Sequence, residues 1–166
     1  MSRRFVLAAS GLGLIALALP RLLDPAPRLV WNATRSVPIG LWRITPGAVV
    51  SVGDTVLAWA PDPARRLAAA RGYLPSNVPL LKTVAATGGD TVCARGPEIL
   101  VNGMVVAVRK ARDRRGRRLP GWQGCQRLAN GAVLLVNPAP DSFDGRYFGP
   151  VPATAIIGKA RPLWLP

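Results

Sequence analysis

The sequence contains no histidine, only two cysteines and only three lysines. Without histidine, a Ser-His-Asp triad, a Cys-His pair and the common histidine-based metal sites are excluded. All but three of the 22 basic residues are arginines, which keep their protons in proteins, so the lysines are among the few groups that could act as a base. A serine–lysine pair therefore remains as the option for nucleophilic catalysis, and it requires neither a metal ion nor another cofactor.

One of the three lysines lies in an apolar segment. Lys82 stands within PLLKTVAATGGD, residues 79–90, next to Leu81 and near Val84. Burial among such neighbours lowers the pKa of an ammonium group and could leave part of it neutral near the working pH. The alternative is a lysine whose stem packs on the core while its ammonium reaches water.

A serine occurs in a conformationally restricted segment soon after the apolar N-terminus. Ser36 is followed by Val-Pro-Ile-Gly, in which Pro38 restricts the backbone and Gly40 frees it again. The hydroxyl could thus be held at a rigid, exposed bend. Serine, proline and glycine are also ordinary turn residues, so a simple turn is the alternative.

A third segment, residues 140–152, reads PDSFDGRYFGPVP. The order of these three segments resembles the signal peptidase I superfamily of membrane-bound Ser-Lys endopeptidases, and it is most similar to the TraF-type conjugative-transfer peptidases. The resemblance covers residues 32 to about 158, although its specific parts are the three short segments. It implies a mainly β fold, an antiparallel β-sheet catalytic domain tethered to one N-terminal transmembrane helix.

The resemblance also implies roles for individual residues. Ser36 would be the nucleophile and Lys82 the general base, with the Ser142 hydroxyl orienting Lys82. Thr34 matches the position whose hydroxyl, together with the backbone N–H of Ser36, forms the oxyanion hole.

Asp144 and Arg146 match an ion pair that supports the site without taking part in the chemistry. The chain departs from the family pattern in two places. The stretch after the lysine, residues 86–90, lacks the family's proline, which predicts a looser turn, and Gly145 stands where many relatives have serine.

The N-terminus has the pattern of a membrane segment. Arg3 and Arg4 precede an apolar stretch that continues to Leu23, interrupted by Arg21. We expect a cytoplasmic tip over residues 1–4, a transmembrane anchor over 5–23 and a periplasmic peptidase domain over 24–166, because basic flanks stay in the cytoplasm. A cleaved signal peptide is the alternative, since residues 16–18 read Ala-Leu-Ala. The expected location is the bacterial inner membrane, with a single pass.

The two cysteines, Cys93 and Cys125, lie between the lysine segment and the third segment. In an exported domain two cysteines most simply form one disulfide. A pair of buried free thiols is the alternative.

Most of the remaining chain has the pattern of β-strands. Asn102-Gly103 supplies the two positive-φ residues of a type I′ turn and predicts a hairpin between residues 99–101 and 104–108. A helix is expected from Pro63 to Gly72, because proline favours the first turn and glycine the end. Further strands are expected at residues 48–50, 55–59, 80–85, 91–93, 132–136 and 155–160.

The enclosed loop between the cysteines carries a run dense in arginine, from Arg109 to Arg118. Such a run can be a solvated hairpin tip or can contact lipid headgroups. The absence of interleaved aromatic residues disfavours a nucleic acid partner.

Three functions remain open. The first is a membrane-anchored Ser-Lys endopeptidase that cuts exported precursors after a small residue; the TraF-type resemblance implies a pilin-like subunit as substrate, released by hydrolysis or by cyclisation. The second is a general housekeeping signal peptidase. The third is a non-enzymatic anchored module that binds lipid or DNA through its arginine-rich loop. The sequence leaves the precursor and the oligomeric state open.

Overall fold

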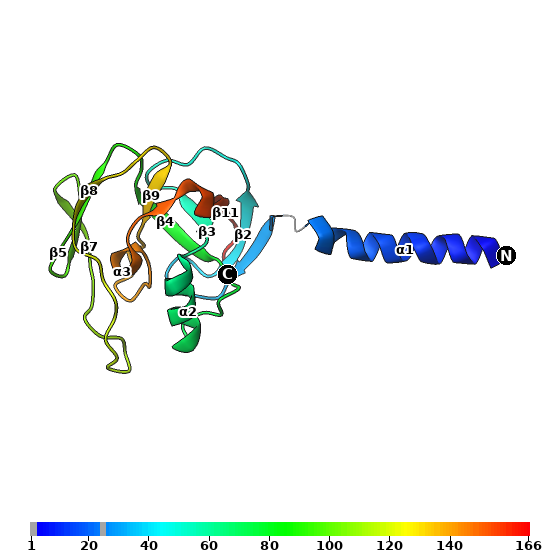
Figure 1. Ribbon diagram of the computed structural model, residues 1–166, viewed down its shortest axis with the longest axis horizontal. Helices are drawn as coiled ribbons and strands as arrows, with labels where there is room; N and C mark the ends of the chain where they lie inside the picture. Colours follow the sequence, from blue (N-terminus) through cyan, green and yellow to red (C-terminus); the bar gives the residue numbers. More distant parts are fainter. Residues whose placement is uncertain (1–2, 24–25) are drawn as a thin grey trace.

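The computed structural model describes residues 3–23 and 26–166, with the backbone alone for residues 16–23. It contains an N-terminal helix and a domain built mainly from antiparallel strands (Figure 1). The elements in chain order are α1 (Arg3–Leu23), β1 (Leu29–Asn32), β2 (Gly40–Thr45), β3 (Thr55–Ala58), α2 (Asp62–Ala70), β4 (Leu80–Ala86), β5 (Thr91–Arg95), β6 (Glu98–Val101), β7 (Met104–Val108), β8 (Gly124–Arg127), β9 (Ala132–Leu135), α3 (Gly145–Phe148), β10 (Val151–Pro152), η1 (Ala153–Ala155) and β11 (Ile156–Trp164).

The strands form two sheets in which every pairing is antiparallel. The larger sheet has the order β1-β2-β11-β3-β4-β9-β10, and the smaller has the order β7-β6-β5-β8. The expected mainly β, antiparallel fold is therefore confirmed.

The larger sheet is covered on both faces close to its centre. Side chains alternate along a strand, so Leu57 of β3 packs with Trp42, Ile44 and Leu81 on one face, whereas Val56 packs with Val84 on the other. A third cluster joins the two sheets through buried side chains of β4, β5, β6 and β9 and of the segments beside β9, namely Ala86, Val92, Ala94, Ile99, Val101, Leu128, Leu134 and Val136. The strand that carries Lys82, β4, therefore contributes side chains to all three buried clusters.

Several predicted elements are confirmed. Residues 98–101 and 104–108 form the expected hairpin, with φ of 50° at Asn102 and 84° at Gly103. The predicted helix is α2, with Pro63 in its first turn and Gly72 just beyond its end at a φ of 70°. The strands expected at 55–59, 80–85, 91–93 and 132–136 are β3, β4, β5 and β9 with shifts of one or two residues at their ends, and the strand expected at 155–160 is β11, which continues four residues further.

The prediction of a strand at residues 48–50 is wrong. These residues have no regular structure, and Val49 is 87% exposed. The expected hairpin partner of β3 is displaced because β11, from the end of the chain, lies between β2 and β3. The apolar pattern of a short segment cannot reveal that a strand from the far end of the chain will pair with β3.

The N-terminal apolar segment is helical, as α1. Among the residues that the structure describes, no helix is both long and apolar enough to cross a membrane. Met1 and Ser2 of the expected cytoplasmic tip, the domain boundary at residue 24 and the side chains of the Ala-Leu-Ala cleavage pattern lie outside the described residues.

Candidate active site

Lys82 is the third residue of β4, a strand whose other side chains are apolar or small. It lies opposite Val56 of β3 and is only 4% exposed. Its Nζ donates a hydrogen bond to Ser142 Oγ at 2.7 Å, across 60 residues of sequence. The lysine is therefore buried and directed at the residue predicted to orient it.

The environment lowers the pKa of Lys82 to about 8. Burial is the main cause, because it removes water from the charged ammonium. The Asp144 carboxylate opposes this shift and the Arg146 guanidinium adds to it. An appreciable fraction of Lys82 is thus neutral near physiological pH, as a general base requires.

Ser36 lies at a bend that is organised by one side chain, Asn32 at the end of β1. The Asn32 amide nitrogen donates to the carbonyls of Thr34, Val37 and Pro38 at 2.8, 3.0 and 3.0 Å. Its Oδ1 accepts from the Thr34 backbone N–H at 3.1 Å. The bend is consequently a specific hydrogen-bonded structure, and Ser36 is half-buried on it.

Thr34 contacts the proposed nucleophile directly. Its Oγ1 lies 3.2 Å from Ser36 Oγ and 2.9 Å from Asn32 Oδ1. Since Oδ1 can only accept, the Thr34 hydroxyl donates to Asn32 and accepts from Ser36 in this arrangement. Thr34 is adjacent to Ser36 as predicted, but its hydroxyl would have to rotate before it could donate to an oxyanion.

The bend that carries Ser36 packs against the strand that carries Lys82, although Leu81 and Lys82 point to opposite faces of that strand. Val37, next to Ser36, and Leu81, next to Lys82, belong to the same buried cluster. Within the described part of the chain, no hydrogen bond joins Ser36 Oγ to Lys82 Nζ. Ser36 Oγ instead contacts Thr34 Oγ1, and Lys82 Nζ donates to Ser142 Oγ.

Asp144 and Arg146 form the predicted ion pair, with Arg146 Nε 2.8 Å from Asp144 Oδ1. Both side chains are at most 2% exposed. Asp144 also accepts from the Arg146 backbone N–H and so caps the N-terminus of α3. The Arg146 guanidinium donates to the carbonyl of Asn137 at 2.6 Å, which ties the pair to the segment after β9.

Comparison with known proteins decides the family. The family model for signal peptidase, peptidase S26, matches residues 2–165. The chain belongs to the peptidase S26 family. The conjugal transfer protein TraF of Agrobacterium fabrum is 32% identical over 99% of this chain and 98% of its own length. The plasmid transfer protein TraF of Escherichia coli is 36% identical over 80% of each chain. A signal peptidase I structure from Enterococcus faecalis aligns with 16% identity and a TM-score of 0.38, over 68% of this chain and 98% of that chain.

The two departures from the family pattern have structural counterparts. The turn after Lys82 lacks the family's proline but is closed by hydrogen bonds, from Thr87 N–H to the Asp90 carboxylate at 2.8 Å and from Asp90 N–H to the Thr87 carbonyl at 3.1 Å. At Gly145, a Cβ would lie 2.7 Å from the Leu135 carbonyl oxygen. A serine would not fit here unless α3 moved away from β9.

Two residues that organise the candidate site were not found by sequence reasoning, namely Asn32 and Asn137. Asn32 is the last residue of β1 and Asn137 lies just beyond β9; near strand ends a short amide side chain commonly bonds to backbone. That signal is too common to have singled them out.

The predicted disulfide joins Cys93 of β5 to Cys125 of β8, which lie opposite each other in the smaller sheet. Among the described residues, no three His, Cys, Asp or Glu side chains are grouped as a metal site would require.

The arginine-rich run is a folded hairpin. A bridge joins Arg112 to Arg118, and Asp113 accepts hydrogen bonds from the backbone of Arg115 and Arg117. Tyr73, just after α2, donates to the same carboxylate, which anchors the hairpin to the helix side of the domain. The run is therefore an ordered hairpin most of whose residues are exposed, in keeping with the solvated hairpin tip.

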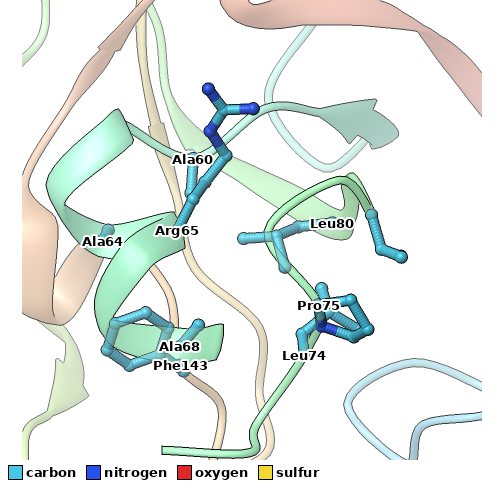
Figure 2. A pocket seen from close by; sticks show the side chains of 9 residues that line it. Ala60, Ala64, Arg65, Ala68, Leu74, Pro75, Leu80 and Phe143 are labelled. Atoms are coloured by element: carbon cyan, nitrogen blue, oxygen red, sulfur yellow. The ribbon is translucent and has the colours of Figure 1, made fainter. Parts of the chain in front are cut away.

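A small apolar pocket lies beside the Lys82 strand, between α2, residues 74–80 and Phe143 (Figure 2). Leu80, two positions before Lys82 on the same face of β4, and Phe143, next to Ser142, both line it. Its volume of about 10 Å³ suits one water molecule or methyl group.

Proposed function

We propose that this S26 family member is a serine endopeptidase in which Ser36 is the nucleophile and Lys82 the general base. The proposal rests on one observation, the state of the Lys82 amine. This amine is buried, its pKa is lowered to about 8, and it points at the Ser142 hydroxyl through a hydrogen bond. The chain has no histidine that could serve as the base instead, and of its three lysines only Lys82 is buried. Membership of the S26 family supports the same assignment.

The proposed reaction proceeds through an acyl-enzyme. Neutral Lys82 accepts the Ser36 proton while Ser36 Oγ attacks the scissile carbonyl carbon. The Ser36 backbone N–H and the rotated Thr34 hydroxyl stabilise the oxyanion. Lys82 then gives its proton to the leaving amine as the peptide bond breaks. Water, or the substrate's own N-terminal amine, attacks the ester next, giving a hydrolysed or a cyclic product and returning the proton to Ser36 through Lys82.

We propose an exported precursor as the substrate, and specifically a pilin-like subunit in conjugative transfer. The support is the similarity to proteins named for conjugal and plasmid transfer, over nearly the whole chain in one case. The methyl-sized pocket beside Lys82 is consistent with a small side chain near the cut. A general signal peptidase is the alternative within the same chemistry.

The proposed location is the periplasmic face of the bacterial inner membrane. A basic flank followed by an apolar segment supports attachment through residues 5–23, and the disulfide fits an oxidising compartment. The lipid bilayer is thus the second proposed partner, and no nucleic acid is required.

The experiment is co-expression of the full chain with a candidate pilin precursor in cells that lack another copy. Ser36→Ala is expected to abolish processing while leaving the level of folded protein unchanged, because the hydroxyl adds chemistry and little packing. Ser51→Ala, at an exposed serine, is the matched control and should process normally.

A β-lactam acylating probe supplies a readout that does not depend on the precursor. Intact-mass analysis should find one adduct on the parent chain and none on Ser36→Ala. Processing by Ser36→Ala at the parental rate would exclude the assignment and favour a non-enzymatic module.

A further inference from the structure

Asn137 is one of the most deeply buried polar residues of the described chain, at 1% exposure. It follows the end of β9, at the point where the pairing of β9 with β4 stops. The last backbone bond of this edge runs from Val136 N–H to the Thr83 carbonyl at 2.9 Å. Beyond this bond, the β4 backbone groups on either side of Lys82 face no strand at this edge. They need another hydrogen-bond partner, because buried peptide groups are almost always hydrogen-bonded.

The Asn137 side chain supplies that partner. Its Oδ1 accepts from the Thr83 N–H at 2.8 Å, and its Nδ2 donates to the Leu81 carbonyl at 3.2 Å. These two groups belong to the residues immediately before and after Lys82. One amide side chain therefore replaces a strand on this edge and restrains the backbone on both sides of the lysine.

The Asn137 backbone is attached to the segment that carries Ser142. Its N–H donates to Asp144 Oδ2 at 3.0 Å, and its carbonyl accepts from Arg146 Nη2 at 2.6 Å. The lysine and the hydroxyl that receives its hydrogen bond are thus connected through a single residue, although they lie 60 positions apart.

We propose that Asn137 is the positioning residue that sets the direction of the Lys82 amine toward Ser142, and that its neutral amide adds no negative charge of its own beside the lysine. The inference rests on the proposed function, because it assigns the amine a base's role. The charged groups that act on Lys82 are Asp144 and Arg146, which form a pair with each other. The residue opposite Lys82 on β3 is Val56, which carries no charge, and Ser142 is also uncharged.

Asparagine and aspartate have the same shape but opposite consequences at this position. Asn137→Asp keeps the acceptor for the Thr83 N–H but loses the donor to the Leu81 carbonyl and places a carboxylate near Lys82. An added opposite charge close to an ammonium group raises its pKa by about 1 unit or more. A residue that merely filled space would not change the lysine titration in this way.

The first test measures Lys82 itself. The full chain in detergent is labelled with ¹³C at lysine Cε and titrated by NMR; only three lysines contribute signals, and Lys82→Arg identifies the relevant one. The parental midpoint is expected near pH 8. Asn137→Asp should raise it by about 1 unit or more, whereas Asn130→Asp, the same change at an exposed turn residue, should leave it unchanged.

The second test uses turnover of the precursor. Asn137→Ala should lower kcat by about tenfold or more with KM little changed, because it misdirects the base without touching the substrate. In Asn137→Asp the rising, acid-side limb of the kcat–pH profile should move to higher pH with the NMR midpoint, so that activity recovers at higher pH. Circular dichroism verifies that each variant is folded, and the isosteric Asn137→Asp carries the test if Asn137→Ala is not.

Two results would overturn the inference: a Lys82 midpoint in Asn137→Asp equal to the parental one, or parental kcat in Asn137→Ala. A parent chain that cleaves no precursor while the NMR midpoint shifts as expected would instead refute the proposed function and leave the lysine's dependence on Asn137 standing.

Discussion

Lys82 should give the enzyme a pH dependence that an ordinary lysine could not. With a pKa of about 8, roughly 9% of the amine is neutral at pH 7, against about 0.03% for a lysine at its usual value of 10.5. The buried position therefore raises the amount of free base at pH 7 by about 300-fold. We expect kcat/KM to rise with pH, to reach half its maximum near pH 8 and to level off above about pH 9.

The assay is cleavage of a precursor-derived peptide by the full chain between pH 6 and 10.5. Lys82→Arg keeps the charge and most of the stem but cannot deprotonate, so it should be folded and inactive at every pH. Lys159→Arg, which should still pair with Asp54, is the matched control and should keep the parental profile. A half-maximum near pH 10, or cleavage by Lys82→Arg close to the parental rate, would refute the reasoning.

The same lysine should also affect stability, in a direction that follows from linkage. Between about pH 8 and 10.5 the unfolded chain holds a proton on Lys82 that the folded chain lacks, so the free energy of unfolding rises with pH across this window. A shift of this size corresponds to about 3 kcal/mol. Urea unfolding at pH 7.5 and pH 10 should therefore show a rise in the parent that is absent in Lys82→Met, and equal pH dependence would contradict burial as the cause.

Three further predictions concern other parts of the molecule. Thr34→Val keeps the shape but removes a proposed oxyanion donor, so kcat should fall by roughly one hundredfold with KM little changed; an unaffected kcat would remove Thr34 from the site. Replacing Cys93 and Cys125 together by alanine opens a link across 32 residues and should lower the free energy of unfolding by about 4 kcal/mol, measured by urea titration against the oxidised parent. Gly145→Ser should destabilise the fold by about 1–3 kcal/mol, because its Cβ would meet the Leu135 carbonyl oxygen; a Tm equal to the parent's would show that α3 adjusts freely.

Local chemistry accounts for the parts of the structure that were predicted correctly. Asn102 and Gly103 can both adopt positive φ, so their hairpin needs no information from elsewhere in the chain. The helix from Pro63 is similarly favoured by its own ends. The contact between Lys82 and Ser142 and the Asp144–Arg146 ion pair were expected from the family resemblance, and the structure contains both.

Long-range pairing accounts for the parts that were missed. Residues 48–50 are apolar and precede a glycine–aspartate bend as a strand could, but β11 occupies the place beside β3 that they would need. The sequence showed Gly145 only as a departure from the family pattern, whereas in the structure a Cβ there would meet the Leu135 carbonyl oxygen of β9. In both cases the deciding atoms belong to residues that are distant in the chain.

The sequence by itself determined the chemistry that is available to this protein: a chain without histidine, one lysine among apolar residues and a serine at a proline–glycine bend. Only the tertiary structure decided how basic that lysine is and where it points. Its pKa depends on burial between β3 and the Ser142 segment, and its direction depends on hydrogen bonds made by Asn137 and Ser142. Desolvation and hydrogen-bond geometry arise from atoms brought together by folding, so residue type and spacing alone cannot specify them.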